Sequence, residues 1–139
     1  MELSLATLIV RDYDRAIDFF TGVLGFELVD DSPSTTNDGR PKRWVEVRPP
    51  GAATGLLLAR ADGATQEQAV GNQVAGRVGF FLRVDDFDEM HARLTSADVT
   101  IVRGPFDQDY GRVLVFEDLE GNRWDLLGPP PSTNRTQTD

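Results

Sequence analysis

The chain contains no cysteine and a single histidine, His91, among its 139 residues. The absence of cysteine excludes disulfide bonds, thiol chemistry and zinc sites built on thiolates, and one histidine excludes a metal site built on several imidazoles. Basic residues are also few, because 14 Lys and Arg stand against 23 Asp and Glu, a formal net charge of -9. Such a charge repels phosphate backbones and anionic lipid surfaces. We therefore expect neither a nucleic acid nor a membrane as a partner.

Long apolar runs are missing as well. No segment approaches the roughly 20 apolar residues that cross a bilayer. The N-terminal stretch MELSLATLIVRDYD has an acid at its second position and an alternating apolar run, a pattern that indicates a strand and not a signal sequence. We expect a cytoplasmic, soluble protein whose length and 40% hydrophobic content suit one globular domain.

The sequence contains an internal repeat. The segment LATLIVRDYDRAIDFF, which begins at Leu5, matches GFFLRVDDFDEMHARL, which begins at Gly79. In both copies an apolar strand runs into an aspartate, Asp12 or Asp86, that can cap a helix by accepting hydrogen bonds from free amides. The spacing of apolar residues predicts helices that begin at about residues 13 and 87, and Gly25 is a suitable stop for the first.

Three short β-rich runs follow each helix. They are FELVDD, KRWVEV and TGLLLAR in the first half, and VTIV, GRVLVFED and NRWDLL in the second. The pattern predicts an α+β fold in which two β-α-β-β-β modules, at about residues 3–61 and 77–128, form one domain over residues 1–128. We expect an exposed loop at residues 31–41, a linker at 62–76 with room for a helical turn, and a flexible tail at 129–139.

These motifs together resemble the vicinal oxygen chelate superfamily, which contains glyoxalase I, extradiol dioxygenases and bleomycin-resistance proteins. The residues that carry the resemblance are VRDYDRAIDFF and LGF in the first half and YGRVLVFEDLEGNRWDL in the second. The resemblance implies curled, mixed sheets whose inner faces form a cup that holds a ligand, and it implies a homodimer.

In the metalloenzymes of that superfamily, four side chains from four strands hold a divalent ion. Carried over by position, these ligands would be Leu5, Leu57 or Leu58, Gly79 and Asp125, of which only Asp125 has an oxygen donor. His91 is expected on the second helix, away from the cup. Glu46, Gln73 and Glu117 could supply donors only from unusual positions. We therefore predict no metal cofactor, with a divalent metal as the alternative.

Asp125 lies among large apolar residues in NRWDLL, where an uncompensated charge is costly. Alternation along the strand places Arg123, Asp125 and Leu127 on one face and Trp124 and Leu126 on the other, beneath a helix. Asp125 would then face the cup, where it could pair with an arginine or bind a polar group of a ligand. The candidate arginines are Arg77, Arg83 and Arg112.

The same alternation selects the other candidate ligand-binding residues. Thr7 and Phe81 are predicted on the inner faces of the first strands of their modules, and Trp44 and Glu46 on the inner face of KRWVEV. Tyr110 and Arg112 open the seventh strand, where members of the superfamily often contact the ligand. Gly79 indicates either space for a ligand ring or a β-bulge.

Three functions remain open at this point. The first is metal-free binding of a small aromatic or cationic organic molecule in an apolar cup, as in bleomycin-resistance proteins. The second is a metal-dependent lyase, isomerase or dioxygenase of the same superfamily. The third is a metal-independent enzyme in which Glu46 or Asp125 acts as a general base.

Overall fold

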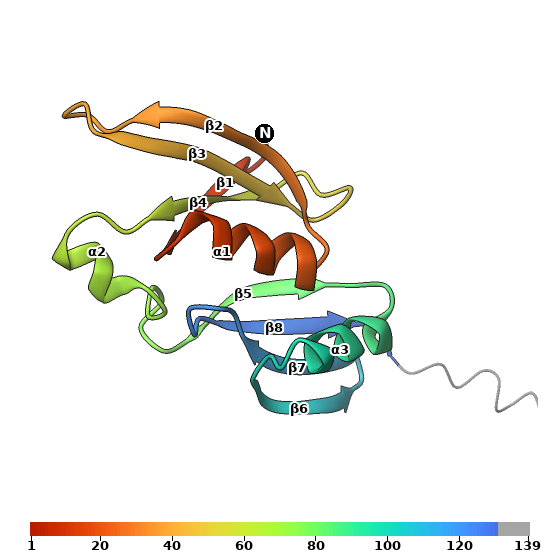
Figure 1. The fold of residues 1–139 in the computed structure, drawn as a ribbon. Coiled ribbons are helices and arrows are strands. Elements are labelled where there is room, and N and C mark those ends of the chain that lie inside the picture. Colours follow the sequence, from red (N-terminus) through yellow and green to blue (C-terminus); the bar gives the residue numbers. More distant parts are fainter. Residues whose placement is uncertain (131–139) are drawn as a thin grey trace, which may run out of the picture. The chain divides into compact units, whose positions relative to one another are not determined.

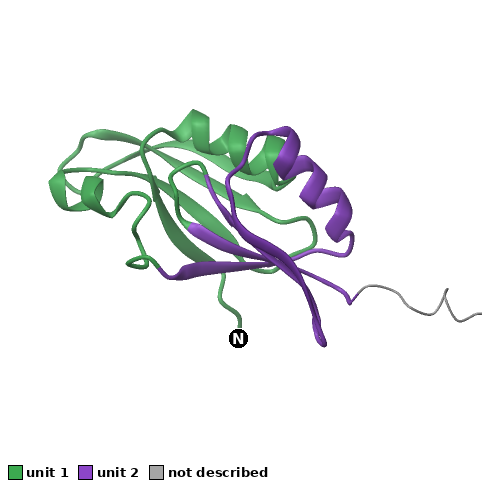
Figure 2. Ribbon diagram, turned by 90° about the horizontal axis from the view of Figure 1, so that it is seen from below, with its two compact units in different colours: residues 1–76, 119–122 green, residues 77–118, 123–139 purple. Residues whose placement is uncertain are grey.

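The computed structural model describes residues 1–130. From residue 131 on, the tail predicted for residues 129–139 lies outside this described part. The chain divides into two compact units, which are coloured separately in Figure 2. Unit 1 comprises residues 1–76 and 119–122, and unit 2 comprises residues 77–118 and those from 123 on.

Unit 1 contains one four-stranded sheet in the order β1-β4-β3-β2 (Figure 1). The parallel pair is β1 with β4, and the other neighbours are antiparallel. The elements are β1 (Leu5–Val10), α1 (Tyr13–Ile17), a π-helical continuation η1 (Asp18–Val23), β2 (Glu27–Thr35), β3 (Pro41–Arg48), β4 (Gly55–Arg60) and α2 (Ala64–Ala69).

Unit 2 repeats this plan with the order β5-β8-β7-β6, and β5 is again parallel to β8. Its elements are β5 (Val78–Arg83), α3 (Phe87–Ser96), β6 (Ile101–Gln108), β7 (Gly111–Glu117) and β8 (Arg123–Gly128). The predicted α+β fold with two β-α-β-β-β modules is therefore confirmed.

Helices α1 and α3 start where the aspartates predict. The Asp12 carboxylate accepts a hydrogen bond from the Arg15 backbone N–H at 3.2 Å, and the Asp86 carboxylate accepts one from Glu89 N–H at 3.1 Å. Each bond satisfies a donor that the first turn of a helix leaves free. Gly25 follows η1 with a positive φ of 78°, which suits a residue without a Cβ.

The exposed loop predicted for residues 31–41 is wrong over most of its length. Strand β2 continues to Thr35 and β3 begins at Pro41, so that only residues 36–40 form the turn. The Ser, Thr and Pro residues in this stretch favour turns locally, but pairing with β3 holds them extended. Pro33 is tolerated because β2 is an edge strand, where a missing N–H costs no sheet hydrogen bond.

Two other segments are also more regular than the sequence predicts. The strand predicted from VTIV extends through Gly104-Pro105 to Gln108, because β6 pairs with β7 along this length apart from two irregularities. The linker contains the short helix α2, in agreement with the helical turn that it had room for.

Alternation along the strands separates a helix-side face from an open face in each sheet. In unit 1, Val45, Val47 and Leu58 are fully buried on the helix side. In unit 2 the fully buried residues include Leu114, Phe116 and Leu126. Such residues hold each helix on its sheet, because burial of a large aliphatic or aromatic side chain contributes roughly 1.5–3 kcal/mol.

Trp124 is central to the core of unit 2. Its ring stacks on Phe80 at 4.6 Å and on Phe116 at 5.8 Å between ring centroids. Its indole N–H donates to the buried Asp118 carboxylate at 2.9 Å. The apolar body and the polar N–H of the ring are both satisfied, as a buried tryptophan requires.

Within residues 1–130 no helix has both the length and the apolar character that a membrane crossing demands.

Replacement of Asp86 by Ala should lower the free energy of unfolding by about 1 kcal/mol, because a free helix amide loses its acceptor. The melting temperature should fall by roughly 3–6 °C. Urea denaturation of the two proteins measures the difference. Asp85→Ala is the matched control, since Asp85 is exposed and does not cap α3. An equal loss of stability in both variants would contradict the capping role.

Candidate functional site

The open face of unit 1 carries a polar and an aromatic residue side by side. Sheet register places Thr7, Leu57 and Glu46 in one row across β1, β4 and β3. Trp44 lies on β3 two residues before Glu46, on the same face, and 38% of its surface is exposed. The row combines an apolar surface with the carboxylate of Glu46, which makes no hydrogen bond or ion pair within residues 1–130.

One edge of this sheet is closed by a side chain. The Gln73 amide oxygen accepts from Ile9 N–H at 2.9 Å, and its NH₂ group donates to the Thr7 carbonyl at 2.6 Å. The amide thus replaces a neighbouring strand along β1. Gln73 supports the row that contains Thr7, and its donor and acceptor are both engaged there.

The open face of unit 2 combines the same two kinds of group. Register places Phe81 beside Asp125, with Val115 and Arg103 next in the same row. Phe81 is 66% exposed, and Asp125 alternates with buried Trp124 and Leu126 as the sequence predicts. Partial burial raises the pKa of Asp125, while the positive charge of Arg103 opposes this shift.

Arg112 lies on the other face of this sheet. Its guanidinium donates to Asp107 at 3.0 Å and to Asp88 at 2.7 Å, and it stacks over the Phe87 ring. The charge of Arg112 is therefore neutralised beside α3, and the suggested pairing of Arg112 with Asp125 is wrong. Tyr110 lies in the turn between β6 and β7 with 69% of its surface exposed.

The family model of the Glyoxalase/Bleomycin resistance protein/Dioxygenase superfamily matches residues 3–126. The chain belongs to this superfamily. An uncharacterized protein of Shewanella frigidimarina (strain NCIMB 400) is 50% identical over 121 residues, which cover 86% of this chain and 87% of that protein.

Solved structures of other proteins share the fold. TnmS3, an antibiotic binding protein from Streptomyces sp. CB03234, has a TM-score of 0.72 and 32% identity, with 93% of this chain and 96% of that chain covered. A glyoxalase family protein from Bacillus cereus has a TM-score of 0.76 over 94% and 95% of the two chains. Its identity is 19%, so this similarity shows the fold alone.

The positions at which metalloenzymes of the superfamily hold their ion do not form a ligand set in this chain. Leu57 and not Leu58 is the position on the open face, because Leu58 is fully buried on the helix side. Leu5 and Leu57 have no donor atom, and Gly79 lies at a register shift between Val78 and Phe80. The bulge interpretation of Gly79 is the one that the pairing supports. Within residues 1–130, no three His, Cys, Asp or Glu side chains form a group that could hold a metal ion.

The other donors considered from sequence do not complete such a set. His91 lies on α3 and packs against the Phe87 ring at 6.0 Å between centroids. Gln73 uses its amide on β1, as described above. A divalent ion that needs several protein donors does not fit these residues.

Two features lie outside the residues that the sequence predicts. Arg103 reaches the row of Asp125 only because β6 pairs with β7 past residue 102. A pocket in unit 1 is lined by Tyr13, Trp44 and Arg60 among others. An alignment of the two repeats in which Arg60 corresponds to Gly128 could have drawn attention to this pocket.

The effect of Arg103 on Asp125 can be tested by titration. Because a folded-state pKa above the unfolded value means that the native protein holds the proton more tightly, stability falls as pH rises through that pKa. Arg103→Gln should raise the pKa of Asp125 further and move this loss to higher pH. NMR titration of the Asp125 carboxyl carbon measures this pKa in the native protein and in the variant.

Arg15→Gln provides the control, since it removes an equal charge from an exposed position on α1 in unit 1. A shift of the same size in both variants would show that total charge, and not the neighbouring position of Arg103, controls Asp125.

Proposed function

We propose that the protein binds a small aromatic or cationic organic molecule without a metal ion. The observation that carries the proposal is the pairing of an exposed aromatic ring with one carboxylate on the open face of each sheet. In unit 1 these groups are Trp44 and Glu46, and in unit 2 they are Phe81 and Asp125.

This combination suits an organic cation for two reasons. A ring face attracts a positive charge through its quadrupole, and a carboxylate attracts the same charge directly. Apolar neighbours such as Leu57 and Val115 supply contact area for the uncharged part of the molecule. The net charge of -9 favours the approach of cations over anions.

The superfamily comparison supports binding as the type of function. TnmS3 is an antibiotic binding protein, and at 32% identity it shares the fold of this chain over nearly the full length of both. Thr7 and Tyr110 are proposed as further ligand contacts on the two units. Arg112 is proposed only as a support for the β7 end of unit 2, since its guanidinium is held by Asp88 and Asp107.

A homodimer and a cytoplasmic location stay predictions. Sedimentation velocity of the purified protein would test the first, and a species with the mass of one chain at micromolar concentration would contradict it.

An aromatic cation should bind and change the fluorescence of Trp44. Benzyltrimethylammonium is a suitable probe. The fluorescence response is assigned to Trp44, because the other tryptophan, Trp124, is buried with 3% of its surface exposed. Glu46→Gln should weaken binding roughly tenfold, because the charge-assisted contact is lost. Fluorescence titration measures both affinities.

The matched control is Glu27→Gln, which removes an equal charge from an exposed position of β2. Equal weakening in the two variants would mean that total charge alone attracts the cation. If no aromatic cation changes Trp44 fluorescence, the proposed function is wrong.

Metal analysis tests the second half of the proposal. Protein purified without added ions should contain far less than one equivalent of divalent metal. Zinc, nickel, manganese and iron(II) should each leave the melting temperature unchanged, because three of the four superfamily positions lack donors. Near-stoichiometric metal, with a stabilisation that Asp125→Ala removes, would establish the metal-dependent alternative.

A further inference from the structure

A pocket of about 270 Å³ opens in unit 1 where two neighbouring strands separate. Strands β3 and β4 pair only from Val45 to Val47 and from Leu56 to Leu58. Beyond these residues the strands diverge, and side chains from both line the pocket. Those used in the argument are Tyr13, Lys42, Arg43, Trp44, Leu57 and Arg60.

One wall of the pocket is an arginine cluster that the internal repeat duplicates. In unit 1, Arg43 donates to Asp14 and Asp31 and lies 5.0 Å from the centre of the Tyr13 ring. In unit 2, Arg112 donates to Asp88 and Asp107 and lies 5.7 Å from the centre of the Phe87 ring. An arginine, two aspartates and a ring therefore have the same arrangement in both units. This cluster by itself is a structural element of the fold.

The units differ beside this cluster. Register in unit 2 continues to the pair Arg112 and Gly128, and a Cβ on Gly128 would lie only 2.7 Å from the Phe87 Cβ. The ring thus closes that end of the sheet. In unit 1 the corresponding pair would be Arg43 and Arg60, which are not paired. Unit 1 therefore has Arg60 and an open pocket at the place where unit 2 has Gly128 and continued pairing of β7 with β8.

Arg60 brings a second cation to the same ring. Its guanidinium lies 5.0 Å from the centre of the Tyr13 ring, as does that of Arg43. Arg43 has two carboxylates, whereas Arg60 makes no hydrogen bond or ion pair to a carboxylate within residues 1–130. Its charge acts through space on Asp62, whose hydrogen bonds go to Arg40. The positive charge of Arg60 is therefore available to an anion.

Two further donors line the pocket without an acceptor in the described residues. The Tyr13 hydroxyl accepts a hydrogen bond from Arg43 N–H at 3.2 Å, which leaves its own hydrogen to be donated. Lys42 is exposed and has no ion-pair partner within residues 1–130. A hydroxyl, an ammonium and a guanidinium are the donors that a carboxylate accepts from.

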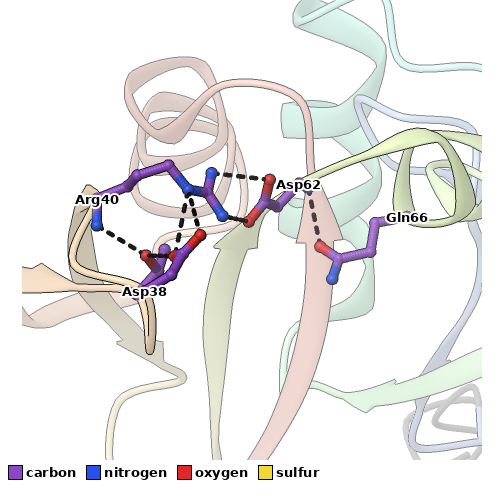
Figure 3. Close-up of polar contacts among 5 residues, drawn as sticks. Asp38, Arg40, Asp62 and Gln66 are labelled. Atoms are coloured by element: carbon purple, nitrogen blue, oxygen red, sulfur yellow. Dashed lines mark hydrogen bonds and ion pairs between the residues drawn. The ribbon is translucent and has the colours of Figure 1, made fainter.

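A set of hydrogen bonds connects several of the residues that line the pocket. Figure 3 shows that Arg40 bridges Asp38 and Asp62, while Gln66 accepts from the Asp62 backbone N–H. The bond from Arg40 lowers the pKa of Asp62, so this carboxylate stays charged and neutralises Arg40. These contacts join the β2–β3 turn to the start of α2, and they occupy Arg40 itself.

We propose that this pocket is a second binding site, which takes the carboxylate of a small planar organic acid. Arg60, Lys42 and the Tyr13 hydroxyl hold the carboxylate, and Trp44 and Leu57 contact the ring. The ligand is opposite in charge to the one proposed for the open faces. The two sites share Trp44 and Leu57, so the charge of the probe distinguishes them.

The negative total charge of the chain does not prevent such a site. At physiological ionic strength, charges more than about 8 Å apart are largely screened, so the nearest groups determine the local potential. The total charge slows the approach of an anion and makes the cations that contact it more important.

Benzoate is the probe, with benzyl alcohol as its uncharged counterpart. Benzoate should shift the NMR signal of the Trp44 indole N–H but not that of buried Trp124. Benzyl alcohol should bind at least tenfold more weakly, and added salt should weaken benzoate binding. Arg60→Gln should weaken binding about tenfold, and Arg60→Lys less, because charge is kept but the planar donor pair is lost.

Arg48→Gln is the matched control, since Arg48 is at the other end of β3 and does not line the pocket. The Arg48→Gln variant should bind benzoate with the affinity of the native protein. The Glu46→Gln variant should bind benzoate at least as tightly as the native protein does. Absence of any benzoate effect on Trp44, equal affinity for benzyl alcohol, or equal weakening by Arg48→Gln would each overturn the proposal. The wild-type NMR comparison decides the matter even if Arg60→Gln fails to fold.

Discussion

The alternation of side chains along β-strands is the constraint on which the rest of the structure depends. Because successive residues point to opposite faces, a strand that buries Val45 and Val47 must expose Trp44 and Glu46 on the other side. The same rule pairs buried Trp124 and Leu126 with the open-face residue Asp125. A shift of one residue would bury a carboxylate under a helix, so the core and the candidate site stabilise one register.

Duplication of one module provides an internal comparison within the chain. The arginine, the two aspartates and the ring recur in both units, which indicates that they hold a helix start against its sheet. Where the copies differ, the difference lies at the proposed second binding site. Gly128 allows Phe87 to close unit 2, whereas Arg60 and the Tyr13 hydroxyl line an open pocket in unit 1. The acidic open-face residues also fall on different strands, at Glu46 and Asp125.

Local patterns predicted those parts of the fold that depend on neighbours in sequence. The caps at Asp12 and Asp86 were predictable because the aspartate lies directly before its helix. The extent of β2 was not, because its Ser, Thr and Pro residues favour turns until β3 pairs with them. The role of Arg112 was also missed, since its partners Asp88 and Asp107 lie on α3 and β6 and meet it only in the folded sheet.

By itself, the sequence determined the two-module fold, the alternation of residues between the two faces of each strand, and the lack of donor atoms at three of the superfamily's four metal positions. These properties follow from residue type and from a period of two, which need no long-range information. Tertiary structure alone decided that Arg103 lies near Asp125, that Leu57 rather than Leu58 is on the open face, and that β3 and β4 separate beside Arg60. Each of these depends on register between strands distant in sequence, and pairing energies set that register only when the sheet forms.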